Sequence, residues 1–197
     1  MDVKRFKIFD KIAAKLVENG IITAEDKEIY EYGLRSAATT VLNIATTILI
    51  GFIFNMIWQS ILFMALYIPL RSYAGGAHAR TPLKCYIFSV ILTVCVLLSV
   101  RYIPYNNDSL LLLTATFISG TIIFIFAPIG DENKPLDETE IKVFKKRTRI
   151  ILFAEIGLTV LLVILNLNFV AVCCVVSLMC VSLVLLLPVL QHYMPKL

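Results

Sequence analysis

Long apolar runs separated by short polar stretches occupy the chain from residue 36 to near its end. A helix that crosses a lipid bilayer needs roughly 20 mostly apolar residues, within a range of about 17–25. The runs that suggest such helices are residues 36–54, 60–70, 85–100, 110–127, 150–165 and 169–190. The pattern predicts an all-α, polytopic membrane protein with about six transmembrane helices.

The second run, residues 60–70, is the weak point of this prediction because it is short for a complete crossing. A brief polar break at residues 55–59 precedes it, and Trp58 occupies an interface position there. The helix either begins inside that break or is tilted or re-entrant. If it does not cross, the number of spans falls and the topology changes.

Residues 1–35 alternate charged and apolar positions. Ile8, Ile12 and Leu16 recur at helical spacing, which favours an amphipathic helix on the membrane surface. Thr23 is a candidate N-cap for a second short helix, with Asp26 three residues later. We expect residues 1–35 to form a cytosolic or interfacial segment and residues 36–197 to form one transmembrane domain. A plain cytosolic lead-in without a membrane role is the alternative for the first segment.

Composition supports the membrane assignment. The 197 residues are 59% hydrophobic and 16% charged, whereas soluble domains average about 45–50% apolar and about 25% charged residues. These values exclude a soluble enzyme, a disordered tail and a nucleic-acid module. The net charge of +4 comes from groups that cluster between the apolar runs, so it indicates membrane topology and not a surface for nucleic acid.

Basic residues set the expected orientation. The polar stretch 71–84 carries three Lys or Arg side chains and no acidic one, and the stretch 128–149 carries six Lys or Arg side chains. The other three connections carry only Arg101. The positive-inside rule then places both termini and both basic stretches in the cytosol of a multi-pass cell-membrane protein.

Candidate chemistry lies in residues 71–85, where His78 precedes Cys85 by seven positions. On one continuous helix the two would share a face but lie about 10 Å apart. Proton transfer requires a distance of about 2.6–3.2 Å between the donor and acceptor heavy atoms, or one bridging water. The chain must therefore break between them, and Thr81-Pro82 supplies an N-cap followed by proline at the first helical position.

That break would place Cys85 in the first turn of the following helix. The positive end of the helix dipole and the charges of Lys84 and Arg80 would then favour the thiolate, which is the nucleophilic form of cysteine. His78 would serve as base or as the imidazolium of an ion pair. The alternatives are a hydrogen-bonded surface histidine and a cysteine that only packs.

The remaining cysteines are Cys95, Cys173, Cys174 and Cys180. They lie inside apolar runs, so we expect small hydrophobic packing residues. One Cys and one His leave two ligands of a zinc site unfilled. We therefore expect no metal and no cofactor.

The run Arg71-x-x-x-Gly75-Gly76-x-His78-Ala, with Cys85 seven residues after the histidine, resembles the AgrB family, the accessory gene regulator B proteins of Gram-positive quorum sensing. Residues 127–136 are similar to the second polar loop of that family. The resemblance extends over nearly the whole chain, including the charged N-terminal part and the apolar runs.

The resemblance implies a membrane-integral cysteine endopeptidase that works as a homodimer. Such proteins cut the C-terminal tail from a small AgrD-type propeptide and help to form its thiolactone or lactone ring. Carried over residue by residue, Cys85 would be the nucleophile and His78 its base. Arg71, Gly75 and Gly76 match positions that support the site, beside Thr81 and Pro82.

Further polar groups are candidates for orienting the base or contacting the substrate. Asp131, Glu132 and Asn133 would lie on the cytosolic side and would complete a triad-like set with His78, with Lys134 beside them. Basic residues that would attract the acidic propeptide tail, or only anchor the chain, are Arg80, Lys84, Lys142, Lys145, Lys146, Arg147 and Arg149. Glu155 is an expected intramembrane carboxylate, which is costly and therefore a functional candidate, or a partner of Arg147 or Arg149.

Two other functions compete with peptide processing. A small transporter would carry polar residues at midplane depth in several spans and often an internal repeat. The spans carry little beyond Asn43 and Glu155, and no repeat is visible. A non-enzymatic membrane scaffold for a peptide partner would function without the Cys85 thiol. The expected partners are thus an AgrD-like propeptide, the lipid bilayer and a second copy of the chain, with no nucleic acid.

Overall fold

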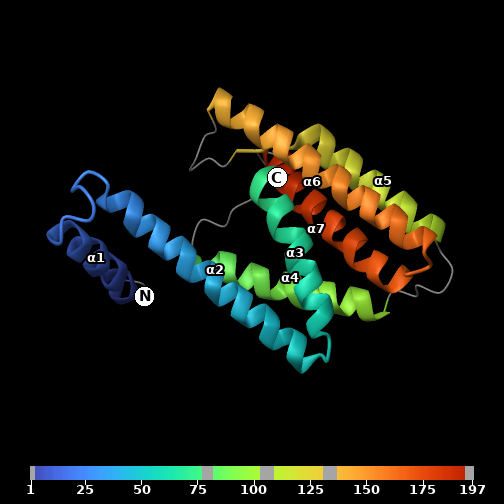
Figure 1. Ribbon diagram of the computed structural model, residues 1–197, viewed down its shortest axis with the longest axis horizontal. Coiled ribbons are helices and arrows are strands. Elements are labelled where there is room, and N and C mark those ends of the chain that lie inside the picture. Colours follow the sequence, from blue (N-terminus) through green and yellow to red (C-terminus); the bar gives the residue numbers. More distant parts are fainter. Residues whose placement is uncertain (1–2, 77–81, 103–108, 131–136, 194–197) are drawn as a thin grey trace. The chain divides into compact units, whose positions relative to one another are not determined.

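The computed structural model describes residues 3–76, 82–102, 109–130 and 137–193, with backbone alone at residues 3–7, 82 and 190–193. Its secondary structure is helical throughout these ranges apart from turns and one isolated β-bridge. The helices, shown in Figure 1, are α1 (Val3–Glu18), α2 (Lys27–Ile53), α3 (Ile57–Ala74), α4 (Pro82–Tyr102), α5 (Ser109–Phe126), α6 (Glu138–Ile164) and α7 (Asn168–Tyr193). The prediction of an all-α membrane protein is confirmed.

The chain divides into two compact units, residues 1–46 and residues 47–197. In the first unit the Lys27 ammonium lies 2.8 Å from the Asp10 carboxylate and joins the start of α2 to α1. The Thr23 hydroxyl accepts a hydrogen bond from the Asp26 amide at 3.3 Å, as the capping pattern predicts. The second helix is not short, however. It continues without interruption to Ile53, because no glycine-rich or proline break separates its polar first turns from the apolar run.

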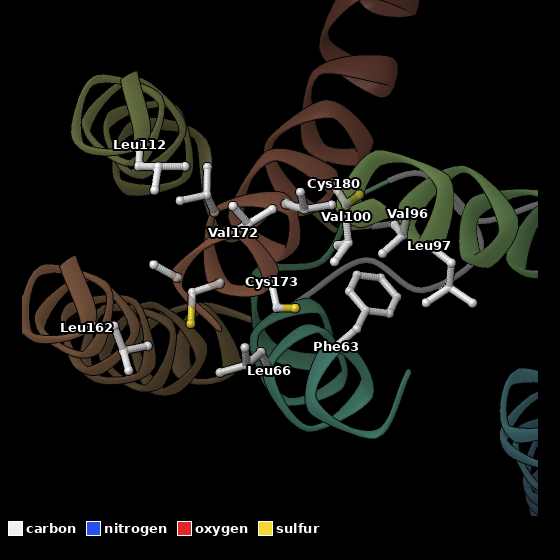
Figure 2. Close-up of a cluster of buried hydrophobic side chains, with 14 of the residues drawn as sticks. Phe63, Leu66, Val96, Leu97, Val100, Leu112, Leu162, Val172, Cys173 and Cys180 are labelled. Atoms are coloured by element: carbon white, nitrogen blue, oxygen red, sulfur yellow. The ribbon is translucent and has the colours of Figure 1, made fainter. Parts of the chain in front are cut away.

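Helix α7 is the centre of the second unit. Of its spanning window, 72% is buried, against 22% for α4 and 28% for α5. It packs against α3, α4, α5 and α6, which explains why its sequence is apolar on every face. Figure 2 shows Val172, Cys173 and Cys180 of α7 among side chains from the surrounding helices. These neighbours are Phe63, Leu66, Val96, Leu97, Val100, Leu112 and Leu162.

The cysteines divide according to their helix faces. Cys173, Cys174 and Cys180 are buried on α7 and pack as predicted. Cys95 is exposed on α4, so the packing prediction is wrong for this residue. The buried positions of α4 nearby are Thr93, Val96, Leu97 and Val100, and the helical period turns Cys95 away from this face.

Four described helices are long and apolar enough to cross a membrane: α2, α4, α5 and α7. Helix α3 has 18 residues, or about 27 Å at 1.5 Å per residue, close to the roughly 30 Å of a hydrocarbon core. It contains Gln59 and Arg71, which lower its mean hydropathy. In α6 every charged residue except Glu155 lies in the first half of the helix. Six crossings therefore remain a prediction.

Candidate active site

Cys85 lies in the first turn of α4, which begins at Pro82 as the sequence predicts. Its side chain is half-buried. Helical Cα–Cβ bonds tilt toward the N-terminus, so the thiol is directed toward the end of α4 where backbone N–H groups have no intrahelical acceptor. The positive end of a helix dipole lies at such a terminus. The expected base His78, the expected cap Thr81 and Arg80 lie outside the described residues.

Arg71 closes the C-terminal end of α3 just before the glycine pair. Its Nη1 donates a hydrogen bond to the Gly75 carbonyl, and its own carbonyl accepts one from the Gly75 amide at 3.2 Å. A cation at this end also compensates the negative pole of the helix dipole. Arg71 therefore fixes the exit of the chain from α3 toward residues 77–81.

Gly75 and Gly76 allow a close approach that no larger residue permits. Their φ angles are +74° and +108°, a region that favours glycine. A Cβ on Gly75 would lie 2.0 Å from the Ile129 carbonyl oxygen, and one on Gly76 would lie 3.0 Å from the Val184 carbonyl oxygen. The glycine pair thus brings the end of α3 into backbone contact with two other parts of the chain.

One of these contacts is a short parallel β-bridge between Gly75 and Ile129. The Gly76 amide donates to the Ile129 carbonyl at 3.2 Å, and the Ile129 amide donates to the Ala74 carbonyl at 3.0 Å. We call these residues the glycine bridge. It joins the two basic polar stretches, 71–84 and 128–149, although they are far apart in sequence. Asp131, Glu132, Asn133 and Lys134 follow it but lie outside the described residues.

Helix α6 is fixed to the same end of α3. The Arg147 Nη1 donates to the Tyr73 hydroxyl at 2.8 Å, and the guanidinium carbon lies 5.1 Å from the centroid of that ring. The Tyr73 and Phe144 rings meet edge to face, with centroids 5.7 Å apart. Arg147 therefore differs from the other basic residues of its stretch, because it contacts the α3 terminus.

Comparisons with known proteins identify the family of the chain. The profile of the family described as Accessory gene regulator B matches residues 9–186. The chain belongs to the AgrB family. It is 31% identical over 150 residues to the putative AgrB-like protein 2 of Clostridium perfringens (strain 13 / Type A), covering 73% of this chain and 70% of that protein.

Two relatives are each called accessory gene regulator protein B. The protein of Staphylococcus intermedius is 20% identical over 142 residues, covering 72% of this chain and 74% of its own length. That of Staphylococcus aureus (strain Newman) is 26% identical over 110 residues, covering 56% and 57%. No solved structure matches the chain. AgrB membership supports involvement in the processing of accessory gene regulator quorum-sensing peptides.

Tyr67 is a residue of this AgrB chain that the sequence reasoning missed. It lies one helical turn before Arg71 on α3, and its ring stacks on Phe63 with centroids 5.0 Å apart. Its hydroxyl interacts with the Arg71 guanidinium and lies within electrostatic range of the Cys85 thiol. The i, i+4 spacing from Arg71 was the signal that could have indicated it.

Glu155 of this AgrB chain is buried, with only 4% of its surface exposed. Neither carboxylate oxygen has a hydrogen-bond partner within the described part of the chain. It is not paired with the two arginines considered for it: Arg147 contacts Tyr73, and Arg149 lies over the Phe124 ring at 4.3 Å. Glu155 instead lies near Cys174 of α7.

Proposed function

We propose that the chain is a membrane-embedded cysteine endopeptidase that removes the C-terminal tail of an AgrD-like propeptide and promotes its cyclisation. The observation that carries the proposal is the position of Cys85 in the first turn of α4, after the Arg71 and glycine-pair segment at the end of α3. A nucleophilic thiol needs such an electropositive, partly accessible environment.

In the proposed reaction, His78 takes the Cys85 proton and the thiolate attacks the scissile carbonyl. The tetrahedral oxyanion is stabilised by N–H groups at the start of α4. The imidazolium then gives its proton to the departing amine, which leaves with the acidic tail. The remaining propeptide is bound to Cys85 as a thioester.

His78 then takes the proton of a propeptide thiol or hydroxyl, which attacks the thioester carbonyl and closes the ring. The bond to Cys85 breaks, and the departing thiolate regains the proton from His78. With a thiol, one thioester replaces another, so the step is nearly balanced. Forming a thioester from an amide is uphill, and removal of the released tail supplies the pull. Water that reached the acyl-enzyme would hydrolyse it before the ring could form. The proposal therefore requires that water be excluded while the acyl-enzyme exists.

The glycine bridge supports this requirement. It holds the beginning of the 128–149 stretch against the end of α3, next to the residues that carry His78 in the sequence. We include Asp131, Glu132 and Asn133 in the proposal as groups that orient His78. Arg80, Lys84 and Lys134 are proposed to attract the acidic tail. A cytosolic site and a homodimer complete the proposal.

The decisive experiment follows thiol alkylation against pH in membranes. Because Cys173, Cys174 and Cys180 are buried, replacing Cys95 alone by Ala leaves Cys85 as the accessible thiol. We expect Cys85 to be alkylated faster than an ordinary cysteine near neutral pH, and His78→Ala to change the rate and its dependence on pH.

The matched control keeps the exposed Cys95 and replaces Cys85 by Ala. This thiol lies mid-helix, so its reactivity should not respond to His78→Ala. A Cys85 thiol that reacts like an ordinary cysteine and is indifferent to His78 would contradict the proposed nucleophile. Cys85→Ser with full propeptide cleavage would contradict it independently.

A further inference from the structure

One face of α6 forms an open groove of about 450 Å³ where the charged half of the helix meets its apolar half. The lining residues are Lys142, Lys145, Lys146, Arg149, Ile150 and Phe153. Their spacing of i, i+3, i+4, i+7, i+8 and i+11 places them on a single face. Cations occupy the first part of the groove, and apolar side chains occupy the part toward the apolar half of α6.

The groove carries four cations and no anionic side chain among its lining residues. Within the described residues, none of its four cations forms an ion pair. The Arg149 Nε is buried and has no hydrogen-bond partner in that part of the chain. Its guanidinium rests on the Phe124 ring of α5 at 4.3 Å, which holds it beside the groove. A buried N–H donor of this kind requires an acceptor from elsewhere.

The apolar part of the groove is largely exposed. Ile150 and Phe153 are each 60% exposed, and they continue into the apolar run of α6. A ligand that satisfies the whole face therefore needs an anionic group joined to a hydrocarbon portion. An acidic peptide tail would meet the cations but would leave the apolar part exposed.

We propose that this groove binds an anionic phospholipid. Its phosphate accepts hydrogen bonds from Arg149 and the neighbouring lysines, and the beginning of an acyl chain lies along Ile150 and Phe153. Basic pockets at the cytosolic ends of membrane helices bind anionic head groups in this manner. The site is independent of the Cys85 chemistry, because none of the lining residues belongs to the proposed catalytic set.

The test measures lipid binding to the purified full chain in detergent by native mass spectrometry. Phosphatidylglycerol and phosphatidylcholine with the same acyl chains are titrated separately. We expect phosphatidylglycerol to bind at least tenfold more tightly. Glycerol phosphate, which has the charge without the chains, should bind at least tenfold more weakly than the whole lipid. Equal binding of the two lipids would overturn the proposal without any substitution being needed.

Two variants on the same helix form a matched pair. Arg149→Gln lies in the groove, whereas Arg147→Gln removes the same charge two residues away, where the side chain contacts Tyr73. We expect Arg149→Gln to weaken phosphatidylglycerol binding about tenfold and Arg147→Gln to change it less than twofold. Phe153→Ala should weaken binding of the lipid but not of glycerol phosphate, which tests the apolar part separately.

A polyglutamate peptide serves as the probe for the competing occupant. If it displaces phosphatidylglycerol at lower concentration than glycerol phosphate does, and loses this ability in Arg149→Gln, the groove is a docking site for an acidic peptide and the lipid proposal is wrong. If Arg147→Gln and Arg149→Gln weaken lipid binding equally, the effect is that of total charge and the groove is not a site.

Discussion

At the scale of single residues, the site depends on side chains that shape the backbone as much as on those that react. Arg71 holds the Gly75 carbonyl, and Tyr67 one turn earlier interacts with Arg71. The absence of a Cβ at Gly75 allows the Ile129 carbonyl to approach. These contacts fix the end of α3, which precedes the proposed nucleophile Cys85 in the chain.

Gly75→Ala should damage the protein more than an ordinary substitution at positive φ. The added Cβ would lie 2.0 Å from the Ile129 carbonyl oxygen, so the glycine bridge must separate. We expect loss of propeptide cleavage and a decrease in unfolding free energy of about 2 kcal/mol or more, since backbone strain alone costs of order 1–3 kcal/mol. Thermal unfolding in detergent measures the second effect.

Gly20→Ala is the control for that variant. Gly20 also has a positive φ, of +66°, but a Cβ there has no atom within 4 Å. It isolates the cost of the dihedral angle from the cost of the collision. Equal losses of stability and activity in the two variants would show that the glycine bridge has no special role.

At the scale of helices, the existence of each element was predictable and its ends were less so. Apolar runs predicted the helices, and Thr81-Pro82 predicted the start of α4. The start of α3 at Ile57 lies inside the polar break, as one of the expected alternatives had it. Its extension to Ala74 was not apparent, because Arg71 interrupts the apolar pattern while remaining compatible with a helix. Gln and Arg have high helix propensity, so they do not end a helix, whereas they do end an apolar run in a hydropathy pattern.

The contacts between helices could not be predicted at all. The glycine bridge joins Gly75 to Ile129 through backbone groups. Because every residue has these groups, the side chains in the sequence do not indicate which two residues pair. Tyr73 and Arg147 are equally ordinary in sequence, and only the packing of α6 beside α3 makes them partners. For the same reason, sequence could indicate Cys85 but not the surroundings that fix it.

The ion pair between α1 and α2 gives a pH dependence to the first unit. The Lys27 ammonium beside Asp10 holds the pKa of that carboxyl below its ordinary value of 3.8. The pair therefore contributes fully above the unfolded pKa, and its contribution is lost as the pH falls through the lower folded pKa. We expect hydrogen exchange in α1 of the full chain to accelerate over that acidic range.

Asp10→Asn is the variant that separates this pair from other carboxylates. It should show faster exchange in α1 than the native chain at neutral pH, and the difference should vanish in acid. The effect is small because both groups are exposed. A difference between the two proteins that persists at low pH would rule out the pair as its cause.

At the scale of the whole molecule, membership of the AgrB family and the apolar helices agree on a membrane protein. Composition alone was sufficient for that conclusion. The number of crossings depends on α3 and α6, because each combines an apolar stretch with charged or polar residues.

Six crossings predict which single cysteines react from outside the cell. In a chain without Cys85 and Cys95, we expect Trp58→Cys and Leu167→Cys to be labelled by a membrane-impermeant maleimide in intact cells. Both parent side chains are exposed. Glu138→Cys, at the start of α6, should react only after permeabilisation. Labelling of Trp58→Cys only in permeabilised cells would mean that α2 does not carry the chain to the outside, and the predicted topology would be wrong.

The burial of α7 has a consequence for genetics. This helix carries none of the proposed reactive groups, yet nearly three quarters of its span is enclosed, and its Val184 carbonyl faces Gly76. A random-mutagenesis screen for loss of signalling will therefore recover many substitutions on α7, and their density will exceed that around Cys85. Such a map of mutational sensitivity would outline the scaffold of the protein, and protein abundance in the membrane must be measured before any of its positions is assigned to the chemistry.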